Sequence, residues 1–511
     1  MTHSALPPLI QRLLEPDFYP HPVKEPIQLI QTHVSYVLLT GDRAYKLKKP
    51  VNFGFLDFST LEKRHHFCQE ELRMNQRGAG DLYLEVLPIT ESGTSWELAG
   101  TGKAVEYALA MRQFPQEDLF ISLFELGELE AHHLEDLGRV VAAFHAEAPT
   151  NDHILSFGRV EQVRASIDEN YRQTESYIGG PQTQEQFEAT KQYTDRFFVE
   201  RAALFEQRIQ GRFIRECHGD LHLRNICFWQ DEIQLFDCIE FNEPFRFVDV
   251  MYDVAFTVMD LDARQRQDLG NAFLNTYIER TGDWEGLQLL PLYRSRQAYV
   301  RAKVTSFLLD DPTIEEATKQ EASQAAAHYY RLAWEYTKPR QGRLILMSGL
   351  SGSGKSTTAR SLARQLGAIH IRSDAVRKHL GGVSLDEKGD ATLYSPEMSQ
   401  RTYARLQELG LLLAQQGFPV ILDAKYDRQA VRLALAEEAE ASNLPLKILH
   451  CTAPRDVLAE RLQQRSGDIA DATADLLEMQ QAGWESFTEA EESQVVQIDT
   501  TQSVTAQLSA I

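Results

Sequence analysis

The chain has 511 residues, 43% of them hydrophobic and 25% charged, which is typical of folded globular proteins and is too long for one hydrophobic core. A formal net charge of −22 repels a phosphate backbone, so nucleic acid is disfavoured as a default partner. The five cysteines are scattered without a CxxC pair, which argues against a disulfide framework and favours a reducing cytoplasm.

The N-terminal stretch MTHSALPPLIQRLLEPDFYP lacks the basic segment and apolar core of a secretion signal. No apolar run in the chain reaches the roughly 18 residues that a membrane span requires. We therefore expect a cytoplasmic protein that does not enter a membrane. The sequence leaves the oligomeric state undetermined.

The first predicted elements form a small β-sheet with one helix. The stretch SYVLLTGDRAYKLKKPV predicts two strands around a turn at Thr40–Arg43, followed by a helix from about Ser59 to Arg77. The stretches DLYLEVLPI and AVEYALAMRQF predict two more strands. Residues 25–114, approximately, are therefore expected to form a β-rich lobe, and residues 115–338 a helical lobe.

One stretch interrupts the helical lobe: CHGDLHLRNICFWQDEIQLFDCIEF, from Cys217 to Phe241, alternates apolar and polar residues like a short hairpin. Asp220 and Asn225 stand five positions apart in it, which is the spacing of the kinase catalytic loop H-R-D-x-x-x-x-N. Asp237 follows the hairpin, where the aspartate of a D-F-G motif would lie. Phosphoryl transfer needs a carboxylate near the attacking hydroxyl and oxygen ligands for Mg²⁺, and this pattern supplies both.

Two other interpretations of this stretch remain open. His218 and His222, next to Cys217, have a spacing that zinc ligands can adopt, but no further cysteine and histidine set completes such a site. The polar residues could also serve only to cap local structure.

The order HGDLHLRN, LFDCIEFN and VDVMYDVAF resembles the aminoglycoside phosphotransferase and choline-kinase group, a branch of the protein-kinase-like fold, over about residues 25–335. The resemblance implies that Asp220 is the catalytic base, that Asn225 and Asp237 bind Mg²⁺, and that Asp253 is a structural acid. Glu240 is similar to the acidic residue of the choline-kinase D-F-E motif, displaced by one position. It is therefore a further candidate metal ligand.

The same resemblance assigns residues of the β-rich lobe. RAYK is similar to V-A-I-K, which makes Lys46 the phosphate-binding lysine, with Lys48 and Lys49 as close alternatives and Glu71 as its helix partner. The backbone around Met111 to Gln113 would face adenine.

Two departures from the group stand out. No G-x-G-x-x-G loop precedes the lysine strand, and Leu223 and Arg224 replace the common Pro-Gly. Arg224 places a cation beside the site and is a candidate substrate contact. The sequence does not predict antibiotic resistance.

A domain boundary is predicted near residue 340. A helical run ends near Tyr336, and Pro339 and Gly342 then precede a new apolar strand. Five apolar strands alternate with helices beyond it: RLILMSG, AIHIRSD, FPVILDA, LPLKILHC and SQVVQID. This alternation predicts a parallel sheet covered on both faces. The expected architecture is an α+β two-lobed protein-kinase-like domain (1–338) followed by an α/β P-loop NTPase domain with a parallel sheet (342–511).

GLSGSGKS matches the Walker A pattern G-x-x-x-x-G-K-[ST] after a strand and at the start of a helix; a glycine-rich turn without function is the alternative. Glycines let backbone N–H groups close around phosphate oxygens, and the helix N-terminus adds positive potential. Lys355 would neutralise the β- and γ-phosphates, and Ser356 would bind Mg²⁺. The predicted nucleotide-binding residues are Gly349, Ser351, Gly352, Ser353, Gly354, Lys355, Ser356 and Thr357.

Three later motifs add charged groups. Asp374 and Arg377 in IRSDAVRKHL would share a helix face, as a base beside an anion-binding cation, although a helix cap explains Ser373 or Asp374 almost as well. Asp423 ends a buried strand as a candidate Mg²⁺ ligand or an ordinary strand-end residue. Arg461 and Arg465 could close over a triphosphate as a lid or simply face solvent.

SGLSGSGKST, RSDAVRK, VILDA and ERLQQR, in this order, resemble the small P-loop kinases that phosphorylate hydroxyls, such as gluconate kinase, chloramphenicol phosphotransferase, polynucleotide 5′-kinase and zeta toxin. The resemblance covers about residues 342–500. It implies that Asp374 is the general base, that Arg377 contacts substrate, and that Arg461 and Arg465 form the lid. These relatives act on unlike substrates, so the acceptor stays open.

The chain as a whole resembles a fused bacterial protein family with these two domains. We expect an ATP- and Mg²⁺-dependent phosphotransferase acting on a small-molecule hydroxyl, with two nucleotide sites. In the alternative, one domain is a nucleotide-sensing regulator of the other. A 5′-hydroxyl nucleic-acid kinase conflicts with the acidic charge.

Overall fold

The computed structural model describes residues 6–93, 95–464 and 467–508. The chain divides into two compact units: Met1–Glu130, Ala143–Asp260 and Leu292–Trp334 form the first, and Ala131–Ala142, Leu261–Pro291 and Glu335–Ile511 form the second. Parts of the helical region thus group with the C-terminal part, so the units do not coincide with the sequence segments 1–338 and 342–511. No helix in the described part of the chain is long and apolar enough to cross a membrane.

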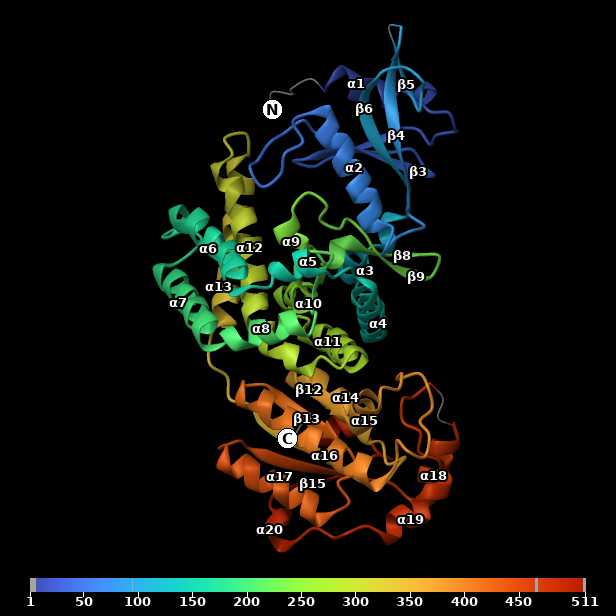
Figure 1. Cartoon of the computed structure of the whole chain (residues 1–511), viewed down its shortest axis with the longest axis vertical. Helices are drawn as coiled ribbons and strands as arrows, with labels where there is room; N and C mark the ends of the chain where they lie inside the picture. The colour runs from blue at the N-terminus through green and yellow to red at the C-terminus, as the bar shows by residue number, and fades with distance from the viewer. Residues whose placement is uncertain (1–5, 94, 465–466, 509–511) are drawn as a thin grey trace. The chain divides into compact units, whose positions relative to one another are not determined.

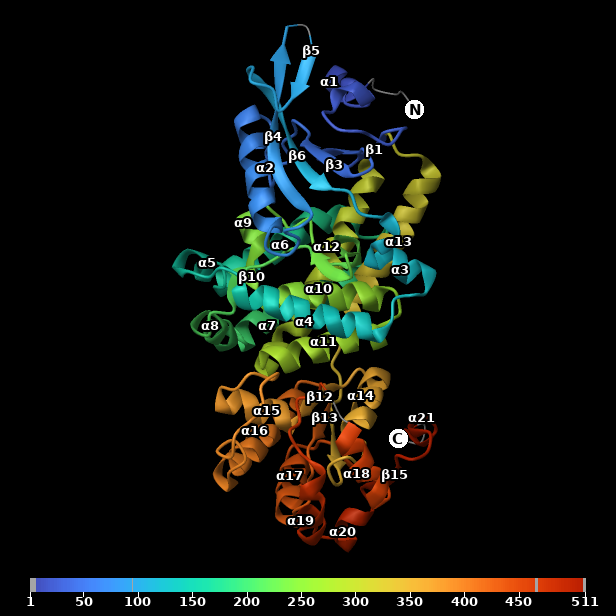
Figure 2. The ribbon, with the colours of Figure 1, turned by 90° about the vertical axis from the view of Figure 1, so that its right-hand side faces the viewer.

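The first unit contains a six-stranded antiparallel sheet with the strand order β1-β2-β3-β6-β4-β5. Its strands are β1 (Gln28–Gln31), β2 (Ser35–Leu39), β3 (Arg43–Lys48), β4 (Tyr83–Ser92), β5 (Ser95–Leu98) and β6 (Ala104–Arg112). Helix α2 (Leu61–Asn75), whose N-terminus is capped by Thr60, packs along β4 and β6, as Figures 1 and 2 show. On β3, Tyr45 and Leu47 face a core that also contains Ile10 of α1 (Pro8–Arg12).

This sheet confirms the four predicted strands, the turn at Thr40–Arg43 and the helix that follows. The sequence did not predict β1 and β5, which are short and mostly exposed and therefore lack an apolar alternation.

The rest of the first unit is mainly helical, as expected after Pro115. Its helices are α3 (Phe120–Leu126), α5 (Asp152–Ser156), α6 (Val160–Thr174), α7 (Gln184–Glu200), α8 (Ala202–Gln210), α9 (Glu243–Arg246), α12 (Leu290–Asp310) and α13 (Glu316–Glu335), together with parts of α4 (Ala131–Glu147) and α10 (Val250–Ala263). Two short antiparallel pairs lie among them: β7 (Ile214–Glu216) with β10 (Phe247–Asp249), and β8 (Ile226–Trp229) with β9 (Glu232–Leu235). The second pair is the predicted hairpin.

The second unit contains a five-stranded, fully parallel sheet with the strand order β12-β13-β11-β14-β15. Its strands are β11 (Arg343–Ser348), β12 (Ile369–Arg372), β13 (Pro419–Asp423), β14 (Leu446–Thr452) and β15 (Val495–Asp499). The helices of this unit are α11 (Gln267–Thr281), α14 (Lys355–Leu366), α15 (Ser373–Gly381), α16 (Pro396–Gln415), α17 (Gln429–Ala441), α18 (Arg455–Gln464), α19 (Leu477–Ala482), α20 (Glu489–Glu492) and α21 (Val504–Leu508). All five predicted strands are present.

Helices cover both faces of this sheet. Ile345 and Met347 of β11 pack against α14, whereas Gly410 of α16 lies against Leu344 and Leu422 on the other face. The two faces of one strand are both buried, which explains why β11 reads as a continuous apolar run. Short 3₁₀ helices occur at Pro16–Phe18, Gln116–Asp118, Glu175–Tyr177, Leu223–Asn225, Trp284–Leu289 and Ala474–Leu476.

Candidate active sites

The predicted catalytic loop is fixed by Asp253 of helix α10. The carboxylate of Asp253 accepts the backbone N–H groups of His218 and Gly219 at 2.7 and 2.8 Å, and it is fully buried. Gly219 adopts a φ of 84°, and a Cβ there would lie 2.7 Å from the carbonyl oxygen of Phe245, so no other residue fits without movement. Asp253 therefore has the geometry of the expected structural acid.

Asp220 and Asn225 meet within this loop. The Asn225 side-chain amide donates to the Asp220 carboxylate at 3.1 Å and to its backbone carbonyl at 3.0 Å, which leaves the Asn225 amide oxygen for a ligand. Burial acts to raise the pKa of Asp220, but the nearby His222, 3.4 Å away, and His218 outweigh it and lower the pKa to about 2. Asp220 is therefore ionised at neutral pH, with 37% of its side chain exposed.

Two lysines and three acids form one ion-pair network between the β-lobe and this loop. Lys46 Nζ lies 2.6 Å from both Glu71 and Asp237. Lys48 Nζ lies 2.7 Å from the other oxygen of Glu71 and also contacts Glu240. The predicted pair of Lys46 and Glu71 is thus present, and Asp237 meets the same ammonium.

The role of Lys48 was not assigned from the sequence, although strand alternation contains the signal. Residues two apart on β3 point to the same face, so Lys46 and Lys48 both reach Glu71 of α2. Lys49 lies beyond the end of this strand and donates instead to the carbonyl of Thr32 at 2.5 Å. Lys48 is almost fully buried, whereas 16% of the Lys46 side chain is exposed.

Glu240 differs most from its predicted role. Only 7% of its side chain is exposed, and its carboxylate is held by Lys48. Asp237, by contrast, has 45% of its side chain exposed and a φ of 61° that turns the chain at this point. The more accessible acid of the two is therefore Asp237.

A tight turn joins the first two strands of the β-rich lobe. Strands β1 and β2 are joined by Thr32, His33 and Val34, and the Thr32 hydroxyl accepts the N–H groups of Val34 and Ser35 at 3.3 and 2.9 Å. The Thr32 side chain therefore stabilises this turn.

The predicted adenine-facing segment lies at the end of β6. Met111 pairs with Ala44 of β3 and Tyr83 of β4. The Gln113 side-chain oxygen accepts the backbone N–H of Gly41 at 2.8 Å, and the backbone N–H of Gln113 donates to the backbone carbonyl of Asp42 at 3.1 Å. The turn between β2 and β3 therefore already uses these two groups of Gln113.

Hydrogen bonds disfavour a zinc site in this loop. His218 Nε2 pairs with the carbonyl of Phe236 at 2.9 Å, and His222 faces Asp220. In the described residues, the metal-ligand types that do gather are His145, Cys217 and Asp253, but the Asp253 carboxylate is already used by the loop. Arg224 lies exposed in the 3₁₀ helix Leu223–Asn225, next to Asn225.

The Walker A residues of the second unit form a loop between β11 and α14. Gly352 has a φ of 79°, and a Cβ there would lie 2.7 Å from the carbonyl oxygen of Leu458. The Ser353 hydroxyl is buried without a hydrogen-bond partner among the described residues. Lys355 Nζ donates to the carbonyl of Leu350 at 2.8 Å, across the loop. Ser356 and Thr357 occupy the first turn of α14, and Thr357 is exposed.

Asp423 and Asp374 lie at the same edge of the parallel sheet, because β12 and β13 are neighbours that end together. Asp423 is held 3.0 Å from His370 Nε2; burial acts to raise its pKa, but His370 outweighs this and lowers the pKa to about 2. Burial raises the pKa of Asp374, Arg372 opposes this shift, and Asp423 adds to it. The two acids are thus electrostatically unlike. His370 was not singled out in the sequence, although it occupies the strand next to Asp423.

The start of α15 does not support the helix-cap interpretation. Arg372 occupies the N-cap position, and no side chain of the described residues caps this helix, so neither Ser373 nor Asp374 does so. Arg377 is 9% exposed and donates to the Leu393 carbonyl and the Ser399 hydroxyl, both at 3.2 Å. The structure thus brings Arg377 against the segment before α16 and leaves Asp374 without a capping role.

Arg461, predicted to form a lid, is hydrogen-bonded to the Walker A loop and to Thr500 instead. It donates to the Thr500 hydroxyl and carbonyl at 2.8 Å and to the Gly352 carbonyl at 3.4 Å. Arg465 lies outside the described residues. Gln480 of α19, which carries no sequence signal, exchanges two hydrogen bonds of 3.0 Å with Ser351.

Sequence comparison finds two known families of domain in the chain. Residues 94–290 match the sequence model of the phosphotransferase enzyme family, and residues 344–486 match that of an AAA domain. Among solved structures, similarity is found to a gluconokinase from Sinorhizobium meliloti 1021 (24% identity, 34% of this chain and 94% of that chain, TM-score 0.25). Similarity is also found to a choline/ethanolamine kinase family protein from Mesorhizobium loti (9%, 64% and 98%, TM-score 0.39).

One group of relatives covers nearly the whole chain. The uncharacterized protein Rv2004c of Mycobacterium tuberculosis (strain ATCC 25618 / H37Rv) is 32% identical over 474 residues, which are 91% of this chain and 92% of the relative. A cytidylate kinase of Ignicoccus hospitalis is 28% identical over 148 residues, 28% of this chain and 77% of that protein. The chain therefore belongs to the family of Rv2004c, and it is a kinase in which a phosphotransferase-family domain precedes a P-loop kinase domain.

Proposed function

We propose that the chain transfers the γ-phosphoryl group of ATP to hydroxyl groups of small molecules at two separate centres. One observation supports this proposal above the others: Lys46 of β3 contacts Asp237 across 191 positions, and Asp237 follows the loop in which Asn225 donates to Asp220. Positioning and charge stabilisation are the main requirements of phosphoryl transfer, and this set supplies a cation, a carboxylate base and oxygen ligands.

In the first centre, Asp220 orients the acceptor hydroxyl and takes its proton. Lys46 contacts the phosphates, and Glu71 keeps it in place. Asn225 and Asp237 fit Mg²⁺, because the Asn225 amide oxygen faces away from its bond to Asp220 and the Asp237 carboxylate is accessible. Mg²⁺ bound there would neutralise the charge of the phosphates. Glu240, held by Lys48, acts as a support of the lysine pair in this scheme.

In the second centre, the P-loop amides and Lys355 bind the phosphates, and Asp374 is the base. Its raised pKa suits a group that must accept a proton near neutral pH. Ser356 and Asp423 carry the oxygen atoms that fit Mg²⁺. Arg377 and Arg461 support the surrounding loops, while Arg224 in the first centre remains available to contact an acceptor.

The test uses the full chain, labelled ATP and a fractionated metabolite extract. Transfer of label to a small molecule is expected, and Asp220→Asn and Asp374→Asn, made separately, should each remove a different labelled product. Absence of any transfer above background, in every fraction, would overturn the proposal. Nucleotide binding without turnover at one centre, with altered turnover at the other, would instead support a regulatory domain.

A further inference from the structure

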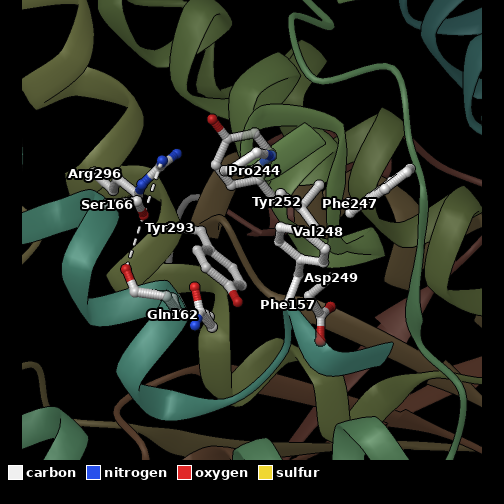
Figure 3. Close-up of a pocket in the computed structure, with 11 residues that line it drawn as sticks. Phe157, Gln162, Ser166, Pro244, Phe247, Val248, Asp249, Tyr252, Tyr293 and Arg296 are labelled. Carbon is white, nitrogen blue, oxygen red and sulfur yellow. Dashed lines mark hydrogen bonds between the residues drawn. The ribbon is translucent and has the colours of Figure 1, made fainter. Parts of the chain in front are cut away.

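A small cavity of about 30 Å³ lies in the first unit, away from the residues of the proposed catalytic set. Helices α6, α10 and α12 and strand β10 line it, as Figure 3 shows. Its polar lining residues include Ser166, Asp249, Tyr293 and Arg296, and Tyr252 provides an aromatic wall. The volume exceeds what one water molecule needs, so the cavity can hold a small polar group.

Arg296 is the unusual residue of this cavity. It is 6% exposed, and no carboxylate of the described residues forms an ion pair with it. One terminal nitrogen donates to the Ser166 hydroxyl at 3.3 Å, whereas the other, Nη1, is buried with no hydrogen-bond partner in the described part of the chain. A guanidinium cannot lose its proton to escape burial, so this charge requires compensation.

The acid in the cavity lining does not supply that compensation. Both oxygens of Asp249 are bound by Arg208, at 2.7 and 2.8 Å, and one of them also accepts the N–H of Met251. Arg296 instead lies over the ring of Tyr252, 4.5 Å from its centroid. An aromatic face attracts a cation but does not neutralise it.

A second cation lies near Arg296, and a second cavity lies beside it. Lys303, two turns further on the same face of α12, has a pKa lowered to about 8 by burial and by the charge of Arg296. A second cavity of about 10 Å³ also borders Arg296. Tyr293 keeps its proton at neutral pH, because burial and Asp249 raise its pKa, so its hydroxyl can donate.

We propose that this cavity binds a small anionic group, a carboxylate or a phosphate, through Arg296 with help from Tyr293. The planar guanidinium presents a free N–H edge that suits either group, and the Ser166 contact fixes its orientation. The site does not depend on the proposed transfer reaction. Strand β10 lines the cavity and pairs with β7. Strand β7 leads directly into the predicted catalytic loop.

The test is isothermal titration of the full chain with sodium phosphate and, separately, sodium acetate, at constant ionic strength. Both nucleotide sites are first saturated with Mg²⁺ and a non-hydrolysable ATP analogue, so that phosphate cannot occupy them. One of the two anions is expected to bind, and its identity distinguishes a phosphate from a carboxylate ligand. Arg296→Gln should weaken this binding by about tenfold or more.

Arg172→Gln is the matched control, because it removes the same charge from an exposed position on α6 and should leave binding unchanged. Tyr293→Phe removes only one hydroxyl and should weaken binding several-fold, which keeps the test decisive if Arg296→Gln fails to fold. Equal binding by the wild type, Arg296→Gln and Tyr293→Phe would show an adventitious ion only. That result, or no binding of either anion, would overturn the proposal.

Discussion

Lys48 is almost completely buried in the first site, with 1% of its side chain exposed, and its ammonium contacts both Glu71 and Glu240. Replacing it with methionine would leave Glu240 without its cation and Glu71 with Lys46 alone. Removing one partner from a buried ion pair destabilises a protein by about 3–5 kcal/mol, so we expect a loss of this size for Lys48→Met. Urea denaturation of the full chain measures it.

Lys49→Met serves as the control for that measurement, since Lys49 is more exposed, donates to the Thr32 carbonyl and lies over the Tyr36 ring, with no ion pair among the described residues. It should change the free energy of unfolding by less than about 1 kcal/mol. Similar losses for both variants would mean that the network adds nothing specific. A Lys48→Met and Glu240→Leu double variant should recover part of the loss, because it removes both charges of one pair.

Protonation of His450 makes the stability of the second unit depend on pH. Burial lowers its pKa to about 4, with Arg432 and Lys355 adding to the shift, and its ring packs against Trp484 and Phe487. The unfolded chain binds a proton near pH 6.5, so the folded state loses stability as the pH falls from about 6.5 to about 4.

His450→Phe should remove part of this loss of folding stability. The expected effect is about 1–3 kcal/mol, after a discount for the partial exposure of the ring. Thermal unfolding at pH 7 and pH 5 compares the variant with the wild type and with His153→Phe, an exposed control. An unchanged difference between the two pH values in His450→Phe would show that other groups cause the acid sensitivity.

For single residues, the sequence identified those whose role follows from their spacing along the chain. Asp220 and Asn225 are five apart, and their mutual hydrogen bond follows from that local geometry. The network partners of Lys48 could not be identified, because Glu240 lies 192 positions away and only the folded sheet brings them together. Gln480, likewise, meets Ser351 across 129 positions without any pattern that marks it.

Among the elements, the P-loop depends on close backbone approach at Gly352. Gly352→Ala would place a methyl group 2.7 Å from the Leu458 carbonyl in a left-handed conformation, so α18 or the loop must move. We expect ATP binding by the second unit to fall by about tenfold or more. Titration of the full chain with a fluorescent ATP analogue measures the change.

Gly367→Ala is the matched control, because Gly367 also has a positive φ, of 62°, but no atom lies within 4 Å of the added methyl group. It should reduce stability by about 1 kcal/mol and leave ATP affinity unchanged. Equal loss of affinity in both variants would attribute the effect to general backbone strain and not to the loop.

The strands of the parallel sheet were all predictable, since apolar residues concentrate in each of them between turns, and β11 and β13 are nearly continuous apolar runs. The edge strands β1 and β5 of the first sheet were not, because exposed strands carry no such run. The turn between β1 and β2 was missed for the same reason. Element detection therefore fails where structure is maintained by backbone pairing alone.

The β1–β2 turn itself yields a prediction. Thr32→Val keeps the branched shape but removes the oxygen that accepts the N–H groups of Val34 and Ser35. If this turn covers the phosphates, the KM for ATP at the first centre should rise several-fold with little change in kcat. Steady-state kinetics in an Asp374→Asn background isolates that centre, and an unchanged KM would argue against contact between the turn and the nucleotide.

For the whole molecule, residues 94–290 and residues 344–486 match separate families, and the two proposed centres have different candidate lysines and different candidate acids. Lys46 belongs to a strand of an antiparallel sheet, and Lys355 is the first residue of helix α14, after a strand of a parallel sheet. In the proposed scheme, a strand lysine binds phosphate at the first centre, and loop amides together with Lys355 bind it at the second. Since neither set contains a residue of the other, each should bind nucleotide by itself.

We therefore predict that the full chain binds two molecules of a non-hydrolysable ATP analogue in the presence of Mg²⁺, as counted by equilibrium dialysis. Lys46→Met should remove one of them by taking away the phosphate contact of the first centre, and Lys355→Met should remove the other. The double variant should bind none, whereas Lys338→Met, which changes an exposed lysine paired with Glu335, should still bind two. A wild-type stoichiometry of one, lost entirely in either single variant, would contradict independent sites and would mean that a single nucleotide needs both lysines.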